Sequence, residues 1–154
     1  MFTDNELEYL DFLLIYGDED NGLTDEEDDA LNDKMEAVYY RMSGEETDRL
    51  GGVAHDLNLL ERFESVTKWT SPTPSTLKKA VQSFQKEDYL EALSFARNIR
   101  GSDDKILRQG LILVCYDRLF ERPERYARFT AKAGSMKYQT RARHSFLTYA
   151  GNSC

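Results

Sequence analysis

The stretch KAVQSFQKEDYLEALSFARNI, which runs from Lys79 to Ile99, decides how this chain folds. Its apolar residues recur every three or four positions, which is the spacing of one face of an α-helix. The polar residues Gln85 to Asp88 interrupt this pattern, and aspartate is a preferred residue at helix N-termini. The stretch therefore predicts two short amphipathic helices, at about 76–86 and 89–100, folded back on each other around the interruption.

More helices are predicted on both sides of this hairpin. Only three prolines and nine glycines occur in 154 residues, which argues against an all-β fold with many turns. We therefore expect an all-α protein of seven or eight antiparallel helices, arranged as a helical-repeat-like array or as an orthogonal bundle. The further helices are expected at about 4–16, 25–42, from Ser43 to Phe63, 104–120, from Pro123 to Gly134, and 136–149.

Three of the expected helix starts carry the capping-box pattern, in which Ser or Thr is followed by Glu three residues later. The pairs are Thr3 with Glu6, Thr24 with Glu27, and Ser43 with Glu46.

Two runs of sequence carry expectations about helix packing. The glycine pair Gly51-Gly52 is expected to permit close packing or to mark a kink. The run from Gly110 to Tyr116 is apolar on every side, which predicts a central, buried helix.

Charge divides the chain into two parts. Residues 1–65 hold 20 acidic and four basic residues, a net charge of −16, whereas residues 66–154 hold eight acidic and 16 basic residues, a net charge of +8. Together these give the −8 of the whole chain. Such polarity indicates halves that face each other, a neighbouring subunit that supplies the complement, or two partners of opposite charge.

The change of sign falls in the only linker-like segment, which contains Pro72 and Pro74. We expect an acidic helical subdomain at 1–64, a linker at 65–76 and a basic helical subdomain at 77–150, joined as one compact unit. Trp69, the only tryptophan, is expected to plug one half onto the other.

The hairpin resembles a tetratricopeptide repeat at its turn and second helix. The pairs Asp88-Tyr89 and Glu91-Ala92 match that family, and Glu87 stands where the family has a glycine. A partial echo follows, because Phe129 lies 34 positions after Phe95 (129 − 95 = 34). The resemblance covers residues 77–133, and it implies an array of helix pairs completed by the other helices.

No pattern of catalytic or metal-binding residues stands out. His55 and His144 are isolated, so a zinc site is not predicted, and His55 with Asp56 is expected to be a surface or half-buried pair. The acidic turn before Gly22 does not fit the register of a calcium loop. We therefore predict no enzyme, no metal and no cofactor.

Cysteines and hydropathy indicate the compartment. Cys115 lies in an apolar run and Cys154 is the last residue, so no disulfide framework is expected. The first residues lack the features of a signal peptide, and no apolar run is long enough to span a membrane. These absences favour a cytoplasmic protein.

The function predicted best is protein–protein interaction, as a small adaptor, regulator or inhibitor. The partner is another protein, which includes a second copy of this chain as a homodimer. Aromatic and arginine side chains dominate interfaces, and Tyr40 stands off the apolar stripe of its helix, so it is expected to be exposed. The candidate contact residues are Tyr39, Tyr40, Trp69, Tyr89, Arg125 and Arg128.

Two electrostatic alternatives remain open. The basic C-terminal helices interleave cations with aromatic residues, a composition that binds nucleic acid. Conversely, residues 18–36 imitate the charge of nucleic acid and would bind a basic protein. The nucleic-acid-binding candidates are Arg125, Arg128, Lys132, Lys137, Arg141 and Arg143.

Overall fold

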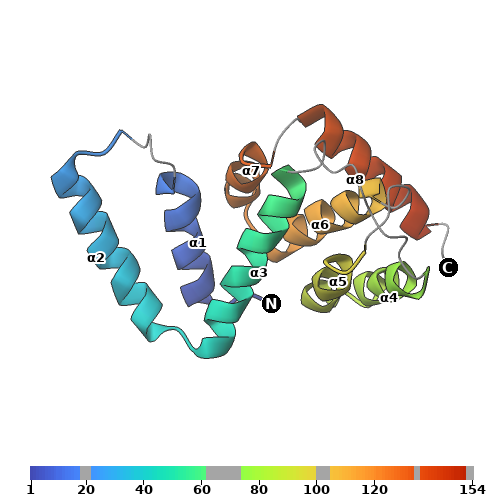
Figure 1. Cartoon of the computed structure of the whole chain (residues 1–154), viewed down its shortest axis with the longest axis horizontal. Helices are drawn as coiled ribbons and strands as arrows, with labels where there is room; N and C mark the ends of the chain where they lie inside the picture. The colour runs from blue at the N-terminus through green and yellow to red at the C-terminus, as the bar shows by residue number, and fades with distance from the viewer. Residues whose placement is uncertain (18–21, 62–73, 100–104, 134–135, 152–154) are drawn as a thin grey trace. The chain divides into compact units, whose positions relative to one another are not determined.

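A computed structural model describes residues 1–17, 22–61, 74–99, 105–133 and 136–151. Within these ranges the chain forms eight α-helices and no strand, which confirms the all-α prediction (Figure 1). The helices are α1 (Asp4–Tyr16), α2 (Asp25–Arg41), α3 (Gly44–Glu61), α4 (Pro74–Gln85), α5 (Tyr89–Ala96), α6 (Lys105–Leu119), α7 (Pro123–Ala131) and α8 (Met136–Gly151). No helix in the described ranges is both long and apolar enough to cross a membrane.

Backbone contacts divide the chain into two compact units, at a point inside α3. The N-terminal unit comprises Phe2–His55, and the C-terminal unit begins at Asp56. The predicted linker at 65–76 lies largely outside the described residues, and α4 already begins at Pro74, within that predicted linker. Proline is well suited to this first helical position, because its missing N–H has no partner there in any case.

The N-terminal unit is a thin layer of three helices, in which α1 and α2 lie side by side and run in opposite directions (Figure 1). All three predicted capping boxes form, at Thr3, Thr24 and Ser43. α1 buries Leu7, Leu10 and Leu14, whereas the only fully buried side chain of the 17-residue helix α2 is Val38. Most of α2 therefore faces solvent.

The C-terminal unit is built around α6, as its apolar sequence predicts. Every residue from Arg108 to Tyr116 is buried, and α6 packs most extensively against α8 and then against α5. A Cβ atom on Gly110 would lie 2.1 Å from the carbonyl oxygen of Ala142 and 2.6 Å from the Cβ of Phe146. Only glycine therefore fits where α6 crosses α8.

One of the two glycines that were expected to permit close packing or to mark a kink, Gly51, has open space beside it. A Cβ atom on Gly51 would meet nothing within 4 Å, because that face of α3 is open. Close packing therefore does not require glycine at Gly51, whereas it does at Gly110.

Two turns in the C-terminal unit hold glutamate in the left-handed backbone region. Glu87 has φ 62° and Glu121 has φ 64°, and they lie 34 positions apart (121 − 87 = 34). At the first turn the amide of Asp88 donates to the carbonyl of Ser83 and that of Glu87 to Phe84, which is the Schellman cap that usually has glycine at its left-handed position. Glu87, which stands where the resembled family has a glycine, thus has the left-handed backbone conformation that favours glycine.

Candidate functional site

The exposed face of α2 carries the strongest candidate for a binding surface. The inward positions of this helix are Leu31, Met35 and Val38, which are buried or half-buried. Because a helix turns about 100° per residue, another set of positions points the opposite way, and all of its members are exposed. We call this set the outer face of α2, and it consists of Glu26, Asp29, Asp33, Glu36 and Tyr40.

Tyrosine gives this face an aromatic end. Tyr40 is 77% exposed, as its position off the apolar stripe predicts, and Tyr39 beside it is 47% exposed. The ring of Tyr39 lies 6.1 Å from that of Tyr9 on α1 and 6.2 Å from that of Tyr40. Tyr39 therefore contacts both Tyr9 and Tyr40, and the ring of Tyr40 stays largely exposed.

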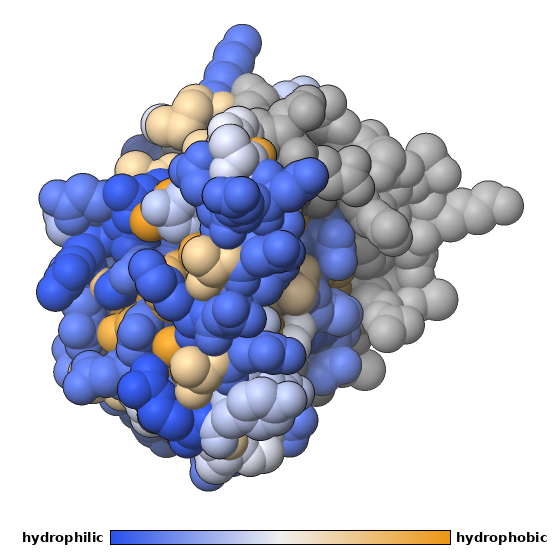
Figure 2. Space-filling model, turned by 90° about the vertical axis from the view of Figure 1, so that its left-hand side faces the viewer, coloured by the Kyte–Doolittle hydropathy of each residue, from blue (hydrophilic) through white to orange (hydrophobic). Residues whose placement is uncertain are grey.

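The charge of α2 is strongly negative. The helix holds seven acidic residues and two basic ones, Lys34 and Arg41. Arg41 forms an ion pair with Glu8 of α1, at 3.3 Å. Four acidic residues on the outer face have no ion pair or hydrogen bond with any described residue, and they are Glu26, Asp29, Asp33 and Glu36. Figure 2 views the side of the molecule on which α2 lies, and its surface is mainly hydrophilic with pale and apolar spots.

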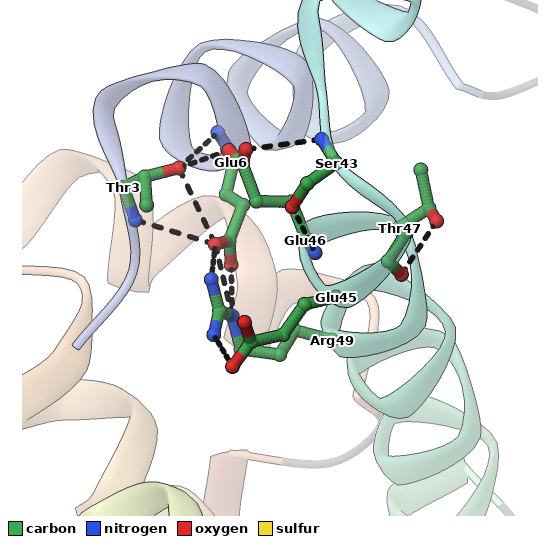
Figure 3. Close-up of polar contacts among 8 residues, drawn as sticks. Thr3, Glu6, Ser43, Glu45, Glu46, Thr47 and Arg49 are labelled. Atoms are coloured by element: carbon green, nitrogen blue, oxygen red, sulfur yellow. Dashed lines mark hydrogen bonds and ion pairs between the residues drawn. The ribbon is translucent and has the colours of Figure 1, made fainter.

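A network of hydrogen bonds and ion pairs joins α1 to α3, the helices that precede and follow α2 in the sequence. Glu6 is fully buried, and the guanidinium of Arg49 on α3 donates to both of its carboxylate oxygens, at 2.5–3.1 Å (Figure 3). Arg49 also pairs with Glu45, and the hydroxyl of Thr3 donates to Glu46.

These bonds shift two ionisation equilibria within the network. The hydrogen bond to Glu6 raises the pKa of Arg49, and the hydrogen bond from Thr3 lowers the pKa of Glu46. The network thereby joins the N-termini of α1 and α3 and holds the ends of the layer that presents α2.

The other predicted contact residues do not lie on this face. Trp69 falls outside the described residues. Tyr89 on α5 is half-buried; its hydroxyl accepts a hydrogen bond from Arg118 at 3.1 Å, and the same guanidinium lies 5.7 Å from the centre of its ring. Arg125 is buried and donates to the carbonyl of Phe120 at 2.6 Å, so it closes the turn between α6 and α7. Arg128 is exposed on α7.

The predicted basic set separates into engaged and exposed side chains. Besides Arg125, Arg143 is engaged: it pairs with Asp117 at 2.9 Å and donates to the hydroxyl of Tyr126 at 3.0 Å. Lys132 is half-buried. The exposed members are Arg128, Lys137 and Arg141. Internal contacts thus engage at least three of the six cations proposed for nucleic-acid binding, namely Arg125, Lys132 and Arg143.

A buried polar cluster was missed by sequence reasoning. Asp56 does not pair with His55, which is exposed; its buried carboxylate accepts two hydrogen bonds from Arg97, each at 2.8 Å, and one from the hydroxyl of Tyr116. The expected surface pair of His55 and Asp56 is therefore wrong. The signal was present, because Asp56 shares the core stripe of Val53 and Leu60 at helical spacing.

The side chains of this cluster have a structural role. Burial raises the pKa of Tyr116 and of the neighbouring Cys115 thiol well above their usual values, so both stay protonated. The hydrogen bond to Asp56 raises the pKa of Arg97, which therefore stays charged. A thiol held in this way is a poor nucleophile. The three side chains pin α3, α5 and α6 together, and among the described residues no group of three or more His, Cys, Asp or Glu could hold a metal ion.

Comparisons with known proteins identify no relative of this chain. Scans against protein-family models, curated proteins and solved structures gave no match to the chain.

Proposed function

We propose that this protein is a non-enzymatic interaction module that binds a basic segment of another protein through the outer face of α2. The observation that carries the proposal is the position of Tyr40, 77% exposed, at the end of a row of four carboxylates on a helix that buries only Val38. A helix with so little burial contributes little to its own unit's core. Its exposed face is therefore free to serve recognition.

The chemistry of the face defines the partner. Carboxylates accept hydrogen bonds from lysine and arginine, and a tyrosine ring attracts a cation placed over its face. Carboxylates at Asp29, Asp33 and Glu36 recur every three or four residues along about 10 Å of helix, at 1.5 Å per residue. A basic helix or extended basic segment presents cations at matching intervals, whereas nucleic acid would be repelled.

A binding assay tests this proposal. The probe is a fluorescent synthetic peptide of Lys, Leu and Ala residues with helical periodicity, and its binding is measured by fluorescence anisotropy at low salt. Tyr40→Ala should weaken binding about fivefold or more, which is the scale of an interface anchor. The combined change Asp29→Asn, Asp33→Asn and Glu36→Gln should weaken it further and flatten its dependence on salt.

The matched control removes charge from exposed carboxylates away from this face. Asp48→Asn, Glu87→Gln and Glu124→Gln together remove three negative charges at exposed positions outside α2. This variant should bind the peptide almost as the wild type does. Equal weakening by both sets would show that only net charge matters, and unchanged binding in Tyr40→Ala would exclude the proposed site.

The nucleic-acid alternative is tested in the same assay. Labelled single-stranded and duplex DNA replace the peptide, at about 50 mM salt, where electrostatic binding is strong. We expect no binding, because Arg125 and Arg143 are held by Phe120, Asp117 and Tyr126. Binding that Arg141→Glu abolishes would favour this alternative instead.

A further inference from the structure

A second exposed surface complements the outer face of α2. Helix α8 packs on α6 through Gln139, Ala142, Phe146 and Ala150. The opposite side of α8 is exposed, and it carries cations rather than carboxylates. We call this set the outer face of α8, and it consists of Lys137, Arg141, His144 and Thr148.

The two faces are opposite in charge and long enough to lie along each other. α8 contains three Lys or Arg residues and no acidic residue, whereas α2 contains seven acidic residues. From Lys137 to Thr148 the α8 face spans about 16 Å, and from Glu26 to Tyr40 the α2 face spans about 21 Å, at 1.5 Å per residue. The two cations of the α8 face, Lys137 and Arg141, lie four positions apart, as do Asp29 and Asp33 on α2, so these two pairs can meet.

Apolar side chains border the basic face. Met136 is 66% exposed and Leu147 is 43% exposed, on the same flank of α8. Neither Lys137 nor Arg141 forms a hydrogen bond or ion pair with any described residue. A helix with cations along its ridge and apolar residues on its flank is the kind of partner that the α2 face, with its carboxylates and Tyr40, would bind.

We infer that the outer face of α8 in a second copy of this chain is a partner of the outer face of α2. The inference rests on the proposed function, because it names the basic segment that α2 binds. The contact joins two different surfaces, so it is heterologous and makes head-to-tail assemblies rather than a self-complementary patch. With two helices at the interface the contact is small, so association is measured at high protein concentration.

Two charge-reversed variants test the inference. The first carries Asp29→Lys, Asp33→Lys and Glu36→Lys on α2, and the second carries Lys137→Glu and Arg141→Glu on α8. All five positions are exposed, so both variants should fold, which far-UV circular dichroism checks. Sedimentation velocity at about 0.1 mM protein and about 50 mM salt measures association.

The wild type should associate, and the association should fall at high salt. Each variant alone should be monomeric, because its two faces carry charge of the same sign. An equimolar mixture should associate again, because the intact α8 of the first variant meets the intact α2 of the second. A monomeric wild type under these conditions, or association of either variant at the wild-type level, would overturn the inference.

The peptide assay separates this outcome from failure of the proposed function. If the wild type is monomeric but Tyr40→Ala still weakens binding of the basic peptide, α2 is a binding surface and its partner is not α8. If neither self-association nor peptide binding occurs, the proposed function falls as well.

Discussion

The two units of this chain keep their helices in place by different means. In the C-terminal unit α6 is buried all round, and glycine lets α8 approach its backbone at Gly110. In the N-terminal unit α2 buries only Val38, and a polar network around Glu6 joins the neighbouring helices. This difference supports the proposed binding surface, because α2 contributes one buried side chain to its unit and leaves its outer face exposed.

The largest expected effect comes from Gly110→Ala. The new Cβ would lie 2.1 Å from the carbonyl oxygen of Ala142, so α6 and α8 must separate. We expect the free energy of unfolding of the C-terminal unit to fall by about 3 kcal/mol or more, at the upper end of overpacking costs. Chemical denaturation followed by circular dichroism measures this, and hydrogen exchange assigns the loss to α6 and α8.

Gly51→Ala is the matched control for this substitution, in the other unit. Gly51 lies inside α3 with open space around it, so alanine brings only its higher helix propensity. We expect a gain of about 1 kcal/mol. If Gly110→Ala were tolerated as well as Gly51→Ala, the close crossing of α6 and α8 would be wrong.

The next effect in size is that of Asp56→Asn. This change replaces the carboxylate that accepts hydrogen bonds from Arg97 and Tyr116, and the amide presents its N–H groups to other donors. Hydrogen bonds to charged groups contribute about 1.5–3 kcal/mol, and Arg97 is 29% exposed and regains some water. We expect a loss of about 2–3 kcal/mol from the free energy of unfolding, measured by urea denaturation.

A double-mutant cycle with Arg97→Leu isolates the ion pair. Removing both charges leaves no unpaired cation near the core, so the double variant should be more stable than the sum of the two single losses implies. Additive losses would show that Asp56 and Arg97 do not interact energetically.

Glu6→Gln should cost less than Asp56→Asn, although Glu6 is equally buried. Its partner Arg49 keeps a second carboxylate, Glu45, after the change. We expect a loss of about 1–2 kcal/mol, confined to the N-terminal unit and read by hydrogen exchange in α1 and α3. The control is Glu8→Gln, which removes an exposed ion pair with Arg41 and should cost less than about 0.5 kcal/mol.

Local signals in the sequence predicted most of this fold. The three capping boxes, at Thr3, Thr24 and Ser43, all form, because their geometry depends on residues three positions apart. Burial of the run from Gly110 to Tyr116 was also predicted from a local pattern, because this run is apolar on every side. Exposure of Tyr40 also follows from helical spacing alone.

Such local signals do not predict which residues meet across different helices. The need for glycine at Gly110 depends on Ala142, which lies on another helix. Arg125 was predicted as a surface contact from its basic surroundings. In the structure it is buried and donates a hydrogen bond to the carbonyl of Phe120, which follows α6. Asp56 differs, because a charged residue on the apolar stripe of Val53 and Leu60 is a local signal of a buried partner, whereas a pair with His55 was expected.

The smallest effect concerns Glu87, the left-handed residue in the turn between α4 and α5. A left-handed conformation costs a residue with a Cβ atom about 1–2 kcal/mol, and glycine has no such cost but loses more entropy on folding. Glu87→Gly should therefore stabilise the C-terminal unit by up to about 1 kcal/mol, raising its midpoint in thermal unfolding. Glu87 is exposed, so its carboxylate itself contributes little.

Glu87→Ala separates the backbone from the side chain at this turn. Alanine removes the carboxylate but keeps the Cβ atom, so φ of 62° remains strained. Only the glycine variant should therefore gain stability. Equal gains from both substitutions would show that repulsion among acidic side chains, rather than backbone strain, limits the turn, and the Schellman geometry of Ser83, Phe84 and Asp88 would then explain nothing about stability. A gain from glycine alone would show that the hairpin of the better-packed unit keeps a local strain that its tertiary contacts outweigh.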